Sequence, residues 1–314
     1  MGIKESMIIP AKMMSYNQEP IVCHSFNDHS IADFINIDTE GNLDKETVES
    51  FGEEWTKFSS FDPAEIERMG NEYFDLLEGI PVNENSYVLD VGCGTGRWSY
   101  YLSPKVKFIE AIDPSNAVFS AARLTDGKPN IRVTKAGVDN IPFDDNSFDF
   151  IFSLGVLHHL PDTVAALKKI FRKVKPGGYF LVYLYYNLDN RGSIYKAIFK
   201  LSNGIRKIIS RTPKKIKQFL AELISFTIYL PFVFLARLCK AMFPGKDFYK
   251  KIPLSYYHNK SLTIIRNDAL DRFGTPLEKR FSKIEIEKML KEAGFNNVVF
   301  SPRTPYWHCV AQKL

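Results

Sequence analysis

A glycine-rich run directly after an apolar segment constrains this chain more than any other feature. Residues 88–96 read Val-Leu-Asp-Val-Gly-Cys-Gly-Thr-Gly, and a helical pattern with Trp98, Tyr101 and Leu102 follows. Glycine lets the backbone turn sharply and lets a ligand come within contact distance of main-chain atoms. The run therefore predicts a buried strand, a tight ligand-binding turn and a helix, in that order.

Short apolar runs recur along the same part of the chain. They lie at residues 87–91, 108–112, 131–134, 148–153 and 179–185, and two more candidates stand at 297–300 and 307–312. Helical patterns separate most of them. This alternation is typical of a parallel sheet with crossover helices, so we expect an α/β fold.

An acidic residue, Asp113, stands at the end of the second predicted strand. An acid at that position can accept hydrogen bonds from both hydroxyls of a ribose. A dinucleotide-binding turn would need its third glycine at position 97, where this chain has Arg97, and the chain contains no phosphate-binding loop of the G-x-x-x-x-G-K-[ST] type. A nucleoside ligand other than a dinucleotide is favoured. An NAD-dependent oxidoreductase and an unrelated α/β protein with a structural turn are the remoter alternatives.

Five ordered motifs make the sequence similar to a known family. The run at 90–96 resembles the first motif of the class I S-adenosylmethionine-dependent methyltransferases, and the stretches at 111–115, 141–149, 157–160 and 174–178 resemble its later motifs. The similarity is greatest to the branch with ubiquinone- and menaquinone-type enzymes and covers about residues 87–186. It implies a Rossmann-like, mostly parallel sheet of seven strands with a reversed last strand, and S-adenosylmethionine as cofactor.

The resemblance also implies a set of cofactor-binding residues. It places Gly92, Cys93 and Gly94 along the methionine part, Asp90 at the amino group, Asp113 at the ribose, and Pro114 and Ser153 beside them. Many relatives bind the adenine amino group with an acid at the position that Gly137 occupies here. Either the backbone amide of Val138, with help from Asp139, contacts the adenine, or the chain binds the cofactor less tightly.

Two adjacent histidines are the first candidates for a catalytic base. His158 and His159 follow the fourth predicted strand, at the sheet edge where a methyl acceptor would lie. A general base accelerates transfer to a hydroxyl by roughly 10²–10⁴, whereas an activated carbon or a carboxylate needs none. The alternative is that these histidines only orient a loop or cap the following helix. His258 and His308 are further candidates.

Residues 187–260 interrupt the strand and helix alternation and form a predicted helical insertion. Between residues 190 and 221 the chain has nine basic residues and no acidic one, so the rest carries a net charge of −4 although the whole chain is at +5. The apolar stretch 223–236 contains Pro231 and is shorter than the roughly 20 residues of a spanning helix, so we do not predict a membrane span. Residues 190–240 are predicted to contact an anionic membrane surface or to cap the acceptor.

The chain thus divides into an N-terminal arm or lid (1–50), a cofactor-binding core (51–186), the insertion (187–260) and a C-terminal completion of the core (261–314). The cysteines Cys23, Cys93, Cys239 and Cys309 are scattered and lack metal-ligand spacing, so we expect neither a disulfide framework nor a metal site. Residues 1–14 lack the apolar core of a secretory signal. A cytoplasmic protein, peripheral at the membrane, is predicted.

These observations together predict a methyltransferase that acts on a small or lipid-like acceptor by in-line displacement. Oxygen is favoured over carbon or nitrogen as the accepting atom. An RNA methyltransferase and a non-catalytic cofactor-binding scaffold at a membrane surface are the alternatives. Nucleic acid is the less favoured partner, because the insertion mixes its charges with aliphatic side chains more than with stacking aromatics.

Overall fold

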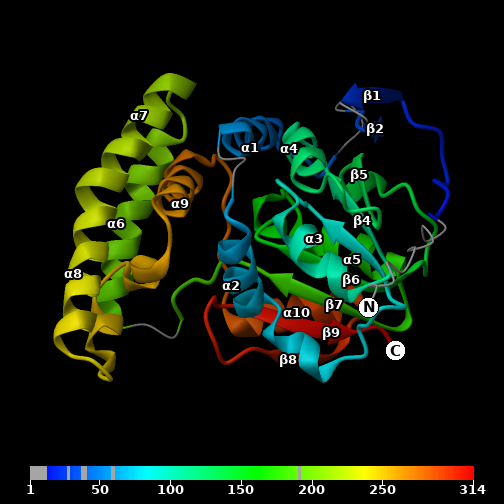
Figure 1. Ribbon diagram of the computed structural model, residues 1–314. Helices are drawn as coiled ribbons and strands as arrows, with labels where there is room; N and C mark the ends of the chain where they lie inside the picture. The colour runs from blue at the N-terminus through cyan, green and yellow to red at the C-terminus, as the bar shows by residue number, and fades with distance from the viewer. Residues whose placement is uncertain (1–12, 27–28, 37–40, 58–60, 190–191) are drawn as a thin grey trace, which may run out of the picture.

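The computed structural model describes residues 13–26, 29–36, 41–57, 61–189 and 192–314 (Figure 1). Within them, nine strands form one sheet in the order β1-β2-β5-β4-β3-β6-β7-β9-β8. The strands are β1 (Val22–Phe26), β2 (His29–Asp33), β3 (Tyr87–Val91), β4 (Phe108–Asp113), β5 (Ile131–Lys135), β6 (Phe148–Leu154), β7 (Val174–Tyr183), β8 (Asn296–Phe300) and β9 (His308–Gln312). The predicted α/β class is confirmed.

Most of the sheet is parallel, as predicted. Strands β5, β4, β3, β6 and β7 run in one direction, and β9 lies antiparallel between β7 and β8. The predicted number of seven strands is wrong, because the N-terminal arm contributes the hairpin β1–β2. Strand β2 joins the edge of β5 at Asp33 and Lys135, whose side chains also form an ion pair of 3.1 Å. This pairing and the burial of Ile31 and Phe34 make the extended segment part of the sheet.

Helices cover both faces of the sheet. They are α1 (Lys45–Lys57), α2 (Pro63–Tyr73), α3 (Arg97–Leu102), α4 (Ala117–Leu124), α5 (Thr163–Lys173) and α10 (Lys283–Ala293). Helices α5 and α10 pack on one face, whereas α2, α3 and α4 pack on the other. Every residue of β3 and β4 is buried, which explains why both strands are rich in apolar residues on both faces, with Asp90, Glu110 and Asp113 as buried exceptions.

The insertion forms a helical layer beside the sheet. Its helices are α6 (Ser193–Ile209), α7 (Lys214–Ile224) and α8 (Leu230–Met242), and α9 (Leu262–Gly274) lies between them and the rest of the molecule (Figure 1). Tyr229 and Val233 pack with Ile265, Ala269 and Phe273 of α9 in a small apolar core. The helical layer therefore extends beyond residue 260 and takes in a helix that we assigned to the C-terminal segment.

Helices α7 and α8 are parts of one longer helix. A π-helical turn, Ser225–Tyr229, joins them into a helix of 29 residues, Lys214–Met242, whose most apolar window has a mean hydropathy of 2.0. The helix nevertheless continues through Pro231, which lies two residues after the π-helical turn, where the regular i→i−4 hydrogen-bond pattern is already interrupted. By length and composition this helix is able to cross a membrane, so our argument from a short apolar stretch is wrong.

Candidate functional site

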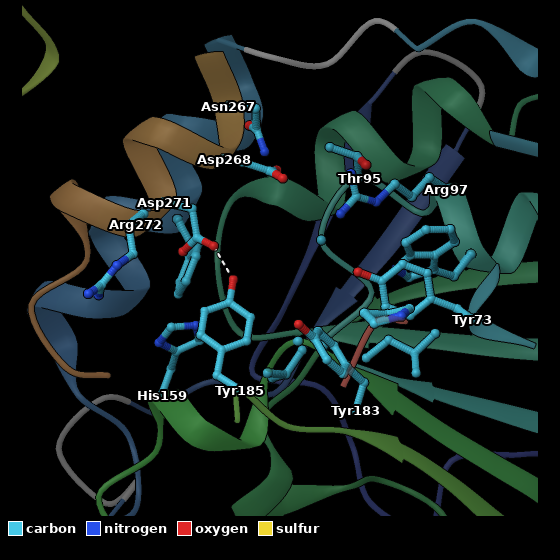
Figure 2. A pocket seen from close by; sticks show the side chains of 18 of the residues that line it. Tyr73, Thr95, Arg97, His159, Tyr183, Tyr185, Asn267, Asp268, Asp271 and Arg272 are labelled. Atoms are coloured by element: carbon cyan, nitrogen blue, oxygen red, sulfur yellow. Dashed lines mark hydrogen bonds between the residues drawn. The ribbon is translucent and has the colours of Figure 1, made fainter. Parts of the chain in front are cut away.

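A cavity of about 380 Å³ lies between the carboxyl edge of the sheet and the helical layer. One wall is formed by the glycine turn after β3 and by the end of β4. The opposite wall is formed by α9, by the segment after β7 and by residues of the insertion (Figure 2). The carboxyl edge of a parallel sheet is where open α/β folds bind their ligands.

The glycine turn is shaped by close packing. Gly92 has a φ of +79°, and a Cβ atom there would lie 2.5 Å from the side chain of Val156. The amide of Gly94 donates a hydrogen bond of 3.0 Å to Oδ2 of Asp113, which joins the turn to the end of β4. The main chain of the turn is thereby exposed to the cavity without a side chain above it.

Asp113 is the acidic residue of this wall. Its Oδ1 accepts hydrogen bonds from the amide of Ser115 at 2.8 Å and from the Ser115 hydroxyl at 2.6 Å. Burial raises the pKa of Asp113, whereas these hydrogen bonds lower it. The carboxylate is thus oriented by its neighbours, and each of its oxygens retains capacity to accept a further bond from a hydroxyl.

Two observations test whether a nucleoside fits this wall. The buried hydroxyl of Thr95 lines the cavity and has no hydrogen-bond partner among the described residues. A second cavity of about 40 Å³ shares Gly92, Pro114 and Val156 with the first and is also lined by Val138. Orphaned buried polar atoms are rare and call for a ligand or a water molecule. The residues therefore fit a ligand that occupies the large cavity and reaches into the small one.

The predicted cofactor-binding residues fall into two groups. Gly92, Cys93, Gly94, Asp113 and Pro114 line the large cavity, and Val138 lines the small one. Asp90, Asp139 and Ser153 line neither cavity.

Those three residues instead form hydrogen bonds with other parts of the fold. Asp90 is 1% exposed and accepts a hydrogen bond of 2.7 Å from the Ser99 hydroxyl, and burial raises its pKa to about 8. Asp139 accepts from the amide of Asn42 and from Lys169 Nζ. The Ser153 hydroxyl donates to the carbonyl oxygen of Val91 at 2.8 Å.

The two adjacent histidines have different surroundings. His159 lines the cavity, and its Nδ1 lies 2.7 Å from the carbonyl oxygen of Leu277. A carbonyl only accepts, so Nδ1 carries the hydrogen and the neutral ring has its lone pair on Nε2. That Nε2 atom is buried and has no partner within the part of the chain that the structure describes. The lone pair of Nε2 is therefore not used by any described residue.

His158 is fully buried and is not among the residues that line the cavity. Burial, with the positive charge of Arg280, keeps its pKa well below the usual value. Its ring stacks on that of Tyr185, with 3.8 Å between the ring centroids. The His158 ring therefore packs against the Tyr185 ring and helps to hold it in place.

The other two candidate histidines lie outside the cavity lining. The ring nitrogens of His308 lie 2.6 Å from the Pro305 carbonyl oxygen and 2.7 Å from Oδ1 of Asp75. In His258, the Nδ1 atom contacts the carbonyl oxygen of Ser255 and the Nε2 atom contacts Nζ of Lys240. All four nitrogens are engaged, so these two histidines connect segments of the fold.

The opposite wall consists of residues that our sequence reasoning missed. Its tyrosines are Tyr183, Tyr185, Tyr186, Tyr229, Tyr256 and Tyr257, and its charged residues are Asp268, Asp271, Arg272 and Arg280. We call this set the tyrosine wall. The hydroxyl of Tyr185 donates a hydrogen bond to Oδ2 of Asp271, and Asp268 points across the cavity toward Thr95 and Arg97 (Figure 2). Burial raises the pKa of Asp268 to about 6, against the opposing charge of Arg97.

Part of this wall had a signal in the sequence. Tyr183 and Tyr185 are two residues apart where β7 ends, a spacing that places both side chains on one face of an extended segment. Asp268 and Asp271 are three residues apart on one face of α9. No feature of the sequence indicates that α9 faces the edge of the sheet.

The described residues contain no group of three or more His, Cys, Asp or Glu side chains that could hold a metal ion. The four cysteines are free thiols, and Cys23 is the exposed one. Burial raises the pKa of Cys93, in the glycine turn, well above its usual value. The chemistry of the cavity therefore depends on its tyrosines, acids, arginines and His159.

Comparisons with known proteins bear on this site. Residues 89–182 match a family described as a methyltransferase domain. A tRNA U34 carboxymethyltransferase of Pseudoalteromonas atlantica is 36% identical over 99 residues, which are 30% of each chain. A demethylmenaquinone methyltransferase of Staphylococcus carnosus is 35% identical over 113 residues, 33% of this chain and 44% of that protein. This chain thus spans less than half the length of these curated relatives.

Among solved structures, a SAM dependent methyltransferase from Aquifex aeolicus superposes with a TM-score of 0.43 and 20% identity, over 80% of this chain and 97% of that one. The matched family range includes the glycine turn, Asp113 and His159. It ends at Val182, one residue before Tyr183, so most of the tyrosine wall lies outside it.

Proposed function

We propose that this chain, which contains a class I methyltransferase domain at residues 89–182, transfers the methyl group of S-adenosylmethionine to a small or lipid-like acceptor. The observation that carries the proposal is one cavity with two unlike walls. The glycine turn and Asp113 form the first, and the tyrosine wall forms the second. Such a cavity can hold two reactants side by side, and alignment is the main requirement of an in-line displacement.

The first wall has the groups that the cofactor needs. The main chain of Gly92 to Thr95 would hold the methionine part, Asp113 the ribose hydroxyls, and the small cavity at Val138 the adenine ring. When bound, the cofactor supplies a methyl group activated by a positively charged sulfur. The protein itself contributes the orientation of Asp113 and a buried site.

The second wall favours an amphipathic acceptor with a hydroxyl group. Tyrosine rings offer apolar surface, whereas their hydroxyls and the carboxylates of Asp268 and Asp271 offer hydrogen bonds. A hydroxyl acceptor must lose its proton during transfer. We assign this proton to Nε2 of His159, which is buried at the cavity and has a lone pair in the neutral ring. His158 then acts only by supporting Tyr185.

An RNA methyltransferase is the second candidate, because the relatives include tRNA-modifying enzymes and the insertion is basic. The similarity to those relatives covers about a third of the chain. It therefore supports the choice of cofactor but does not identify the acceptor. Co-purifying nucleic acid, seen in the ratio of absorbance at 260 and 280 nm, would favour this candidate. A non-catalytic scaffold would bind the cofactor but show no turnover.

Calorimetry with S-adenosylhomocysteine tests the cofactor site. The wild-type chain should bind, and Asp113→Ala should weaken binding by about ten- to a hundredfold, the effect of losing hydrogen bonds to a charged group. Asp145→Ala is the matched control, because Asp145 is 53% exposed and pairs with Lys173. Absence of wild-type binding at millimolar ligand would remove the proposal.

The acceptor is then sought with radiolabelled cofactor. Quinols, glycans and carboxylic acids are incubated with the protein, and transferred label is measured in each product. Label on a hydroxyl compound supports the assignment to oxygen. Label confined to RNA, or to a carbon or nitrogen atom, would contradict it.

A further inference from the structure

The helical layer exposes a large apolar surface, which we call the outer face. On α6 it consists of Ile198, Leu201, Ile205 and Ile208, and on the helix Lys214–Met242 it consists of Ile216, Phe219, Leu223, Phe226, Ile228, Phe232, Phe234, Leu235, Leu238 and Met242. Each of these side chains is between 37% and 71% exposed. Monomeric soluble proteins rarely expose apolar patches of this extent, so the outer face indicates an interaction site.

The opposite side of the same helices is firmly packed. Tyr229 and Val233 are buried against α9, and Arg266 of α9 makes a two-point ion pair with Glu222, with both nitrogen–oxygen distances at 2.7 Å. Removing the long helix from the layer would break this ion pair and expose the apolar core. The helix is therefore held with one side on the protein, which favours a partner that covers its outer face over a bilayer that surrounds it.

Basic side chains border the outer face. Lys196, Lys200 and Lys207 form an exposed row along α6, and Arg211 and Lys215 are exposed where α6 turns into α7. Glu222 is the only acidic residue between positions 192 and 246, and Arg266 neutralises it. Two copies of such a face would repel each other, whereas anionic lipid headgroups would be attracted.

We propose that the outer face docks on the surface of an anionic lipid bilayer, with α6 and the long helix lying in the plane of the membrane. The apolar side chains enter the boundary between headgroups and acyl chains, and the lysine row contacts the headgroups. This orientation places the acceptor site beside the membrane. Tyr229 lines the cavity, while Phe226 and Ile228 of the same π-helical turn are exposed, so lipid lies within about one helix diameter, ~10 Å, of the tyrosine wall.

Vesicle flotation with the full chain tests the docking surface. Vesicles of phosphatidylcholine alone are compared with vesicles that also contain phosphatidylglycerol, at low and at high salt. We expect binding to the anionic vesicles that weakens with salt. Lys200→Glu/Lys207→Glu should reduce the partition coefficient by at least about 25-fold, since each lost basic residue near a charged surface contributes about fivefold and the two new glutamates are repelled. Lys107→Glu/Lys288→Glu is the matched control, because both lysines are exposed on the sheet domain.

The apolar contribution needs a second pair of variants. Phe226→Ser/Phe234→Ser should lower binding at least tenfold at high salt, where the apolar contact dominates. Ile284→Ser/Val299→Ser replaces equally exposed residues of the sheet domain and should bind like the wild type. Circular dichroism and binding of S-adenosylhomocysteine show that each variant is folded.

Three results would overturn the inference. The first is that the wild type does not float with the vesicles, and the second is that the Phe226→Ser/Phe234→Ser variant floats equally well. The third is that light scattering shows a wild-type dimer and that this variant is a monomer, which would assign the face to a second copy. The acceptor part of the inference rests on the proposed function. Flotation without binding of S-adenosylhomocysteine would remove the methyltransferase proposal alone, and binding without flotation would remove the membrane surface alone.

Discussion

The two walls of the cavity are built in different ways. The wall formed by the glycine turn and Asp113, to which our proposal assigns the cofactor and which we call the cofactor wall, is mostly main chain. Its central residues lie in two short runs at the ends of adjacent strands, β3 and β4. The tyrosine wall is mostly side chain and is assembled from β7, α9, the π-helical turn and the segment before α9. A wall of main chain tolerates little change, whereas a wall of side chains can be adapted to a new acceptor without altering the sheet.

The largest expected effect concerns the chemical step between the walls. His159→Gln keeps a hydrogen-bonding side chain but removes the proton acceptor, so methyl transfer to the acceptor found in the screen should slow by roughly 10²–10⁴. The affinity for S-adenosylhomocysteine should stay within about twofold, because the residue serves the other reactant. His258→Gln is the control, since His258 is not among the residues that line the cavity. Unchanged single-turnover rates in His159→Gln would refute the assignment.

The next effect tests whether main-chain geometry governs the cofactor wall. Gly92→Ala would place a Cβ atom 2.5 Å from Val156, and the destabilisation should exceed that of Gly127→Ala by about 1–3 kcal/mol. Gly127 has nearly the same φ, +76°, but nothing lies within 4 Å of its Cβ position. Both variants share the strain of a positive φ, so the difference in urea unfolding isolates the clash. Equal free energies of unfolding for the two variants would contradict the packing argument.

A pH effect is expected from the tyrosine wall. The folded pKa of Asp268 is about 6, above the ordinary 3.8, so the folded state holds this proton more tightly than the unfolded state. The associated stability is present below pH 4 and is lost as the pH rises through 6. Asp268→Asn cannot ionise at this position, so it avoids this loss of stability. At pH 8 its free energy of unfolding should exceed that of the wild type by at most about 3 kcal/mol.

Measurement of that variant requires thermal or urea unfolding at pH 4, 6 and 8. The difference from the wild type should be small at pH 4 and largest at pH 8. Asp144→Asn is the control, because Asp144 is exposed and should leave the pH profile of the wild type unchanged. A constant difference at all three pH values would show that another property of Asp268 is responsible.

The smallest expected effect concerns one hydrogen bond of the tyrosine wall. Tyr185→Phe removes the donor to Asp271 and should lower the free energy of unfolding by about 1–2 kcal/mol. Tyr186→Phe removes the hydroxyl of the next residue, whose ring packs near Tyr306 and Trp307. Its unfolding curve should stay close to that of the wild type. Equal losses in both variants would indicate that the Tyr185 hydroxyl has no special role.

Prediction from the sequence succeeded where the determining residues are close together in the chain. The class I resemblance and the α/β fold are confirmed, because strand, glycine turn, helix and acid all fall within residues 87–113. The hairpin β1–β2 was missed because its membership of the sheet depends on a distant partner, Lys135. The continuity of the helix Lys214–Met242 was missed because Pro231 reads as a break unless its position after a π-helical turn is known.

The sequence by itself therefore determined the cofactor wall and the family of the central domain, since local backbone geometry specifies both. The tertiary structure alone decided which residues face that wall. It placed Asp268 and Tyr229 at the cavity, placed His159 but not His158 in its lining, and left the outer face without a protein neighbour among the described residues. The physical reason is that burial and charge at these positions depend on how α9 and the insertion pack, and packing joins residues that are far apart in the chain.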